Sequence, residues 1–144
     1  MIAVDTNILV YAHRRDATFH TAAKRVIDEL VRAESPWAIS WATIHEFLAI
    51  CTNPRIYKPA SPMPVALEQL RQWLHGGAVV LSETSDHMDT LSLLLRDGNV
   101  TGGRVHDARI AAICLDHGVN ELWSADRDFA RFSNLAVRNP LVQV

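Results

Sequence analysis

The chain has 144 residues, of which 49% are hydrophobic and 21% charged, so we expect one folded domain with a sizeable core rather than a disordered segment. Its formal net charge of −2 argues against a protein that binds nucleic acid only through a basic surface. No apolar run reaches the roughly 20 residues that a membrane-spanning helix needs, and no signal peptide is visible. We therefore expect a cytoplasmic protein without a membrane segment, in which Cys51 and Cys114 are buried free thiols.

Short strands and helices are predicted to alternate along the chain. Apolar runs predict strands over residues 2–4, 37–39, 78–81, 121–124 and 135–137. Helical spacing predicts helices over residues 7–12, 41–52 and 105–117, and a helical turn over 126–131. Three further helices are predicted between residues that cap or end them: from Thr18 to Pro36, from the end of the 53–64 segment to Gly76, and from Ser85 to Gly98. Ser40 is the predicted cap of the helix over 41–52. This alternation predicts one α/β domain over residues 1–144, with a central parallel sheet of about five short strands flanked by helices on both faces.

The spacing of apolar residues also predicts which side of each helix is buried. The expected inward residues are Ala23, Val26, Ile27, Leu30 and Val31, then Ile44, Phe47, Leu48 and Cys51, then Leu67, Leu70, Trp73 and Leu74, and finally Met88, Leu91, Leu94 and Leu95. Residues 53–64 contain four prolines, so this segment is expected to be an irregular loop.

Four acidic residues, Asp5, Glu46, Asp107 and Asp126, stand out by their placement. Asp5 and Asp126 each follow a short apolar strand, and open α/β sheets bind ligands at the carboxyl ends of their strands. Carboxylates gathered at such an edge repel one another unless a cation joins them, and their hard oxygens suit Mg²⁺ or Mn²⁺. The sequence therefore predicts a metal-dependent enzyme that acts on a phosphate ester, with RNA as the favoured substrate.

Each of these positions also has a purely structural interpretation. Asp5 and Asn7 are residues that often cap a helix after a strand. Glu46 lies beside the apolar side of its helix, where a solvated surface residue is equally expected. Asp107 lies in a first helical turn, where its negative charge interacts favourably with the helix dipole. In the segment 124–129, a cap and a salt bridge would explain two of the three charges. From the residues alone, these alternatives stay open.

The order and placement of these residues resemble the PIN-domain ribonucleases, in particular the VapC-type toxins of bacterial toxin–antitoxin pairs. The resemblance rests on Asp5-Thr6-Asn7 after the first strand, on Glu46, on His106-Asp107-Ala108 and on Ser124-Ala125-Asp126-Arg127-Asp128-Phe129. It implies a single PIN-like domain. It implies a catalytic quartet of Asp5, Glu46, Asp107 and Asp126, with Asp5, Asp107 and Asp126 as ligands of Mg²⁺ or Mn²⁺. It also implies supporting roles for Thr6, Asn7, Ser124 and Asp128.

For this family the implied activity is hydrolysis of RNA phosphodiester bonds by a toxin, whose partners are the RNA substrate, a small cognate antitoxin and a second copy of the chain. Arg104, Arg109 and Arg127 lie near the acids in sequence and are candidates to hold the RNA backbone, or to neutralise an acid. The alternative is a non-catalytic PIN-like domain that binds RNA or protein. A phosphatase or phosphotransferase that uses Asp5 as its nucleophile is disfavoured, because Asn7 occupies the position where such enzymes usually carry a second acid.

Overall fold

Five short parallel strands form the central sheet, in the order β3-β2-β1-β4-β5, in the computed structural model, which describes residues 1–142. The strands are β1 (Ile2–Val4), β2 (Trp37–Ser40), β3 (Ala78–Leu81), β4 (Glu121–Trp123) and β5 (Val137–Arg138). The predicted parallel sheet is confirmed, and residues 143–144 of the predicted domain lie outside the described residues.

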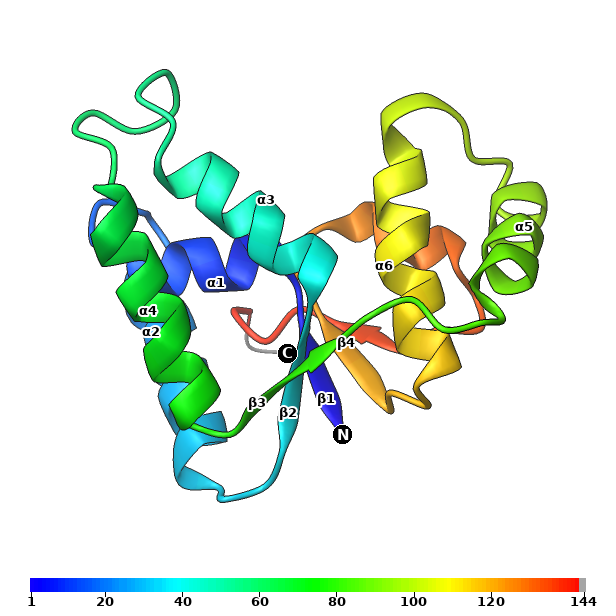
Figure 1. Ribbon diagram of the computed structural model, residues 1–144, viewed down its shortest axis with the longest axis horizontal. Helices are drawn as coiled ribbons and strands as arrows, with labels where there is room; N and C mark the ends of the chain where they lie inside the picture. The colour runs from blue at the N-terminus through cyan, green and yellow to red at the C-terminus, as the bar shows by residue number, and fades with distance from the viewer. Residues whose placement is uncertain (143–144) are drawn as a thin grey trace.

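Helices cover both faces of this sheet. They are α1 (Thr6–His13), α2 (His20–Arg32), α3 (Trp41–Cys51), α4 (Met63–His75), α5 (His87–Asp97) and α6 (Val105–Asp116), with short 3-10 segments η1 (Gly102–Arg104) and η2 (Arg127–Arg131). In Figure 1, α1 to α4 gather on the left of the sheet, and α5 and α6 lie together on its right. Within residues 1–142, none of these helices has the length and apolar content needed to cross a membrane.

The two faces are explained by the alternation of strand side chains. Successive residues of a strand point to opposite faces. Val4, Trp37 and Ile39 therefore pack into the core formed with α1 to α4, whereas Ala3 and Ala38 pack into a second core that contains most of α6. Burial on both faces is why the strands read as continuous apolar runs rather than as alternating patterns.

Both thiols are buried and free, as predicted. Cys51 belongs to the core on the α1 to α4 side and Cys114 to the core around α6. Burial raises the pKa of each thiol to about 12. The thiolate form is therefore disfavoured, and both side chains act as small apolar residues.

One predicted helix cap is confirmed and two are wrong. The Ser40 hydroxyl accepts a hydrogen bond from the Thr43 backbone N–H at 3.1 Å at the start of α3. Thr18 does not cap α2, because a turn closed by the His20 N–H on the Ala17 carbonyl delays the helix. Ser85 does not cap α5: the Thr84 hydroxyl accepts the Asp86 N–H in the preceding turn, and the helix begins after Asp86.

The predicted buried faces are right at their centres and wrong at their edges. Trp73 and Leu94 are buried, but Leu74, Val31 and Met88 are exposed, Met88 by 72%. A helix of a two-faced α/β domain contacts its neighbours along a stripe, and residues at the border of the apolar face fall outside the stripe. Helical spacing locates this stripe but does not give its width.

Several predicted ends shift by one or two residues. The proline-bearing loop ends at Pro62, because α4 begins at Met63 and takes Pro64 into its first turn, where the missing N–H costs no hydrogen bond. The last strand covers Val137–Arg138 rather than 135–137, and Leu135 is buried in the turn before it. These shifts leave the predicted order of elements unchanged.

Candidate active site

The strand order of the sheet defines where a ligand crevice should form. Starting from β1, the chain builds outward to β2 and β3 on one side and to β4 and β5 on the other. Open α/β sheets bind ligands at the carboxyl ends of their strands, where this order reverses. Asp5 follows β1 and Ser124 follows β4 at this point, and Glu46 lies on α3, which follows β2.

Asp5 is held by a network that joins the ends of β1 and β4. Its carboxylate accepts hydrogen bonds from the Ser124 hydroxyl at 2.7 Å and from the Asn7 amide at 3.3 Å. The Asn7 amide nitrogen also donates to Ser124 Oγ at 3.2 Å, and its oxygen accepts from the Ala125 backbone N–H at 3.0 Å. Asp5 makes no capping bond to α1, so the helix-cap interpretation of Asp5 and Asn7 is wrong.

Burial raises the pKa of the Asp5 carboxyl from an ordinary 3.8 to about 6. The hydrogen bond from Ser124 lowers this pKa in part, and the negative charges of Glu46 and Asp107 raise it further. Both carboxylates are therefore close enough to Asp5 to oppose its ionisation. Glu46 and Asp107, which are distant from Asp5 in sequence, thus lie in its electrostatic neighbourhood, although no three acids converge in the arrangement of a metal site among the described residues.

The Ser124→Ala variant tests the network around Asp5. Ser124 is buried, donates to Asp5 and accepts the Asp126 backbone N–H at 3.0 Å. Its loss leaves a buried acceptor and a buried N–H without this partner, so we expect the free energy of unfolding to fall by about 1–3 kcal/mol in urea denaturation. The exposed Ser133→Ala variant is the control. Equal stability of the two variants would contradict the structural role of Ser124.

A second cluster of carboxylates surrounds the Arg104 guanidinium. Arg104 Nη1 lies 3.1 Å from Asp107 Oδ2 and 3.3 Å from Asp126 Oδ2, and Nη2 pairs with Asp128. Asp126 also accepts the Asp128 backbone N–H at 2.9 Å through Oδ1, which caps η2. The cap of this interpretation is therefore confirmed for Asp126, but the salt bridges of Asp126 and Asp128 are made with Arg104, outside the segment 124–129.

Asp107 lies in the first turn of α6 and is half-buried. Burial raises the pKa of its carboxyl, the hydrogen bond from Arg104 lowers it, and the nearby charges of Asp126 and Asp128 raise it. The net shift of the pKa is upward, with burial as its largest cause.

Two further residues complete the surroundings of Asp5. Glu46 is exposed on α3 and, within residues 1–142, forms no hydrogen bond or ion pair through its side chain, yet its charge reaches Asp5. The Thr6 hydroxyl is buried beside Asp5 and has no hydrogen-bond partner among the described residues. A buried hydroxyl without a partner is rare, which makes Thr6 a candidate to contact a bound species.

Of the three arginines proposed from sequence, only Arg104 contacts the acids. Arg109 donates to Glu83 at 2.5 Å, and Arg127 is exposed and forms no ion pair with an acid in the described part of the chain. For Arg104 the predicted alternative, neutralisation of an acid, is confirmed, whereas its pairing with three acids was not predicted. Its three-residue spacing from Asp107 was the available signal, because residues so spaced are neighbours on a helix.

The donor set of this region fits Mg²⁺ or Mn²⁺ by its chemistry, because it consists of carboxylate and hydroxyl oxygens. Within residues 1–142, however, no three acidic, histidine or cysteine side chains converge in the arrangement of a metal site. Asp107, Asp126 and Asp128 converge on a guanidinium instead. A cationic group is therefore already accommodated among these carboxylates.

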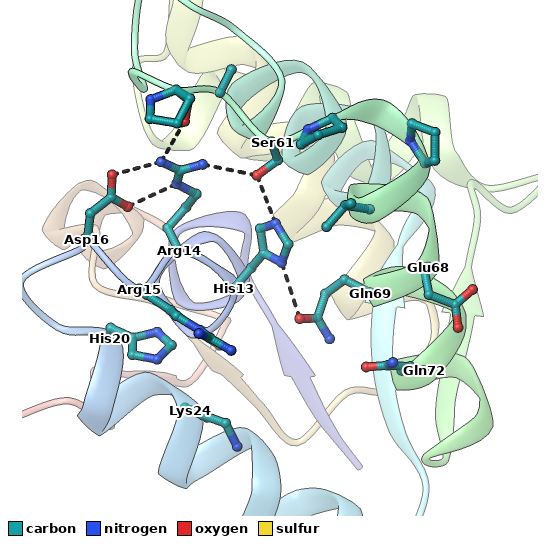
Figure 2. Close-up of a pocket in the computed structure, with 16 residues that line it drawn as sticks. His13, Arg14, Arg15, Asp16, His20, Lys24, Ser61, Glu68, Gln69 and Gln72 are labelled. Atoms are coloured by element: carbon teal, nitrogen blue, oxygen red, sulfur yellow. Dashed lines mark hydrogen bonds and ion pairs between the residues drawn. The ribbon is translucent and has the colours of Figure 1, made fainter.

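A separate cavity of about 860 Å³ lies at the other end of α1 (Figure 2). His13 bridges Ser61 at 2.9 Å and Gln69 at 3.2 Å, and Arg14 donates to Ser61 at 3.1 Å and to the Pro59 carbonyl at 2.9 Å. Burial lowers the pKa of His13; the bond with Gln69 partly offsets this. These contacts fasten the proline-bearing loop to α1. None of the four candidate acids lines this cavity.

Comparisons with known proteins agree with the predicted family and fold. The family model described as PIN domain matches residues 2–135. The ribonuclease VapC43 of Mycobacterium tuberculosis is 33% identical over 144 residues, which cover 98% of this chain and 96% of that protein. Among solved structures, VapBC2 of Rickettsia felis, bound to a promoter DNA fragment, gives a TM-score of 0.70 at 18% identity and covers 96% of this chain and 98% of that one. The sarcin-ricin loop cleaving toxin VapC20 of M. tuberculosis gives 0.65 at 20% identity, covering 90% and 93%.

Proposed function

The chain belongs to the PIN-domain family and within it to the VapC-type ribonucleases, and from this we propose that it is an endoribonuclease that hydrolyses RNA phosphodiester bonds as the toxin of a toxin–antitoxin pair. The single observation that carries this proposal is the buried Asp5 carboxylate, which Ser124 and Asn7 hold where the carboxyl ends of β1 and β4 meet. The non-catalytic alternative is disfavoured, because the curated relatives that match nearly the whole chain are named ribonucleases.

We propose that Asp5, Asp107 and Asp126 hold Mg²⁺ or Mn²⁺, with Glu46 as the fourth acid. A bound divalent cation supplies hydroxide near neutral pH and offsets charge that develops on phosphoryl oxygens. The acidic character of the site supports this proposal, because a phosphodiester is itself negative and uncompensated carboxylates would repel it. The unpartnered Thr6 hydroxyl beside Asp5 is a further oxygen that points to a polar ligand here.

The other residues of the site position these acids. Ser124 and Asn7 fix the Asp5 carboxylate and tie β1 to the segment after β4. Asp128 completes the turn in which Asp126 lies, since its N–H binds the Asp126 carboxylate. Glu46, exposed at the edge of α3, is the acid most accessible to a large substrate such as RNA. Orientation by fixed side chains of this kind lowers the entropic cost of bringing reactants together.

Cleavage of a labelled pool of random-sequence RNA by the purified chain tests the proposed function. We expect cutting with Mn²⁺ or Mg²⁺, none with EDTA, and at least about a hundredfold loss in the Asp107→Asn variant, because the variant lacks a metal-binding charge. Asp89→Asn is a matched control, since Asp89 also occupies the first turn of a helix but lies on α5. Full activity of Asp107→Asn, or full activity in EDTA, would contradict the proposal.

We also propose an antitoxin partner and a homodimer. Solved structures similar to this fold are toxin–antitoxin complexes, which supports the first partner. For the second, three of the four tryptophans are buried, but Trp41 at the start of α3 is 47% exposed. Exposed tryptophan is enriched at protein interfaces. Sedimentation velocity at micromolar concentration should show a dimer, and a strict monomer would contradict this part of the proposal.

A further inference from the structure

We propose that Arg104 is an internal competitor of the divalent cation: its guanidinium holds Asp107, Asp126 and Asp128, and these carboxylates become available to the cation only when Arg104 is displaced. This inference rests on the proposed function and deepens it. It makes Arg104 a positioning residue that sets the metal concentration at which the site fills, rather than a ligand of RNA alone.

Arg104 occupies the carboxylate oxygens that a cation would use. One guanidinium engages three carboxylates from two separate segments, Asp107 on α6 and Asp126 and Asp128 around η2. Two of these carboxylates, those of Asp107 and Asp126, are proposed metal ligands. A positive group and a divalent cation that use the same oxygens of one carboxylate cluster oppose each other's binding, both by occupying the oxygens and by charge repulsion.

The surroundings of Arg104 allow its side chain to move away from the carboxylates. Its side chain is 46% exposed, so the guanidinium can move into water without crossing a packed core. It ends the 3-10 segment η1, which begins with Gly102 in the left-handed region at φ 62°. A Cβ atom at Gly102 or Gly103 would meet nothing within 4 Å, so the two glycines that precede Arg104 border open space.

The net charge of the cluster sets the direction of the effect. Three carboxylates face a single guanidinium, so the cluster keeps two formal negative charges that a cation can neutralise. Removal of the guanidinium should therefore strengthen cation binding rather than collapse the site. A purely structural Arg104 would give the opposite result, because its loss would let the carboxylates spread apart.

Isothermal titration calorimetry with Mn²⁺ on the full chain and on Arg104→Gln tests the inference. We expect the Kd for Mn²⁺ to fall at least about tenfold in the variant, since a unit positive charge at ion-pair distance from the ligands is removed. Arg127→Gln is the control, because it removes a nearby positive charge that makes no ion pair with the acids among the described residues. The Kd of this variant for Mn²⁺ should differ from the wild-type Kd by less than about threefold.

A second measurement follows Arg104 directly. In the wild-type chain, the arginine Nε–H NMR signal that is absent in Arg104→Gln should move towards that of a free arginine side chain as Mg²⁺ is added. An unchanged or raised Kd in Arg104→Gln, with wild-type binding intact, would overturn the inference and leave the proposed function standing. Absence of Mn²⁺ binding in the wild-type chain and in both variants would overturn the proposed metal site itself.

Discussion

The Asp5→Asn variant should lose RNA cleavage and at the same time become more stable near neutral pH. Cleavage should fall at least about a hundredfold, because the substitution removes one of the proposed metal-binding charges. Stability should rise because Asp5 is only 4% exposed and its charged form is disfavoured by burial. A carboxamide of the same shape still accepts the hydrogen bond from Ser124.

The sign and size of this stability change follow from the pKa. In the folded chain the pKa of Asp5 is raised from 3.8 to about 6, so between these values the folded state binds more protons than the unfolded state. The wild-type chain therefore loses stability as the pH rises through this window, by roughly 2–3 kcal/mol in total, and Asp5→Asn does not. Urea denaturation in EDTA should show a small difference at about pH 4 and the full difference above about pH 6.

Asp89→Asn is again the control, because Asp89 is exposed. Its free energy of unfolding should stay within about 0.5 kcal/mol of the wild-type value, as is usual for a surface substitution. If Asp5→Asn were less stable than wild type at neutral pH, or if the difference did not depend on pH, burial of a charged Asp5 would be the wrong description of this site.

The Phe47→Ala variant should produce the largest loss of stability. Phe47 is fully buried on α3, and its ring packs edge-on against Trp73 at 5.3 Å and His13 at 5.4 Å between centroids. Truncation leaves a cavity where α1, α3 and α4 meet, so the free energy of unfolding should fall by about 3–5 kcal/mol. This is a large part of the roughly 5–15 kcal/mol that stabilises a typical domain.

His45→Ala is the matched control for this prediction, because His45 carries a ring on the same helix but is exposed. Its substitution should change the free energy of unfolding by less than about 1 kcal/mol. Equal losses in the two variants, measured by urea denaturation, would show that α3 does not pack as described.

The sequence was sufficient to predict the architecture, because strand burial on both faces leaves a strong signal. Runs such as Ile2–Val4 and Ala78–Leu81 are apolar throughout, and the helices between them have the spacing of one buried face. Cap positions were less predictable, since any Ser or Thr near a helix start looks alike in sequence. Ser40 caps its helix, whereas Ser85 stands in a turn that Thr84 organises.

The placement of Asp5 was predictable for a different reason. Asp5 directly follows β1, and a residue at the carboxyl end of a central parallel strand lies at the edge of the sheet where ligands bind. What sequence does not contain is the tertiary partner of each side chain. The bond from Ser124 to Asp5 spans 119 positions, and Arg109 turns to Glu83 rather than to the acids. Such pairs depend on how distant loops meet.

The site assignment is the central claim, and Mn²⁺ binding followed by electron paramagnetic resonance tests it most directly. At a protein concentration where the wild-type chain removes the signal of free Mn²⁺, the variants Asp5→Asn, Glu46→Gln, Asp107→Asn and Asp126→Asn should each leave more free Mn²⁺ in solution. The control Asp89→Asn should behave as wild type. Binding of Mn²⁺ by all four variants with wild-type affinity would contradict the assignment of these acids to one metal-dependent nuclease site.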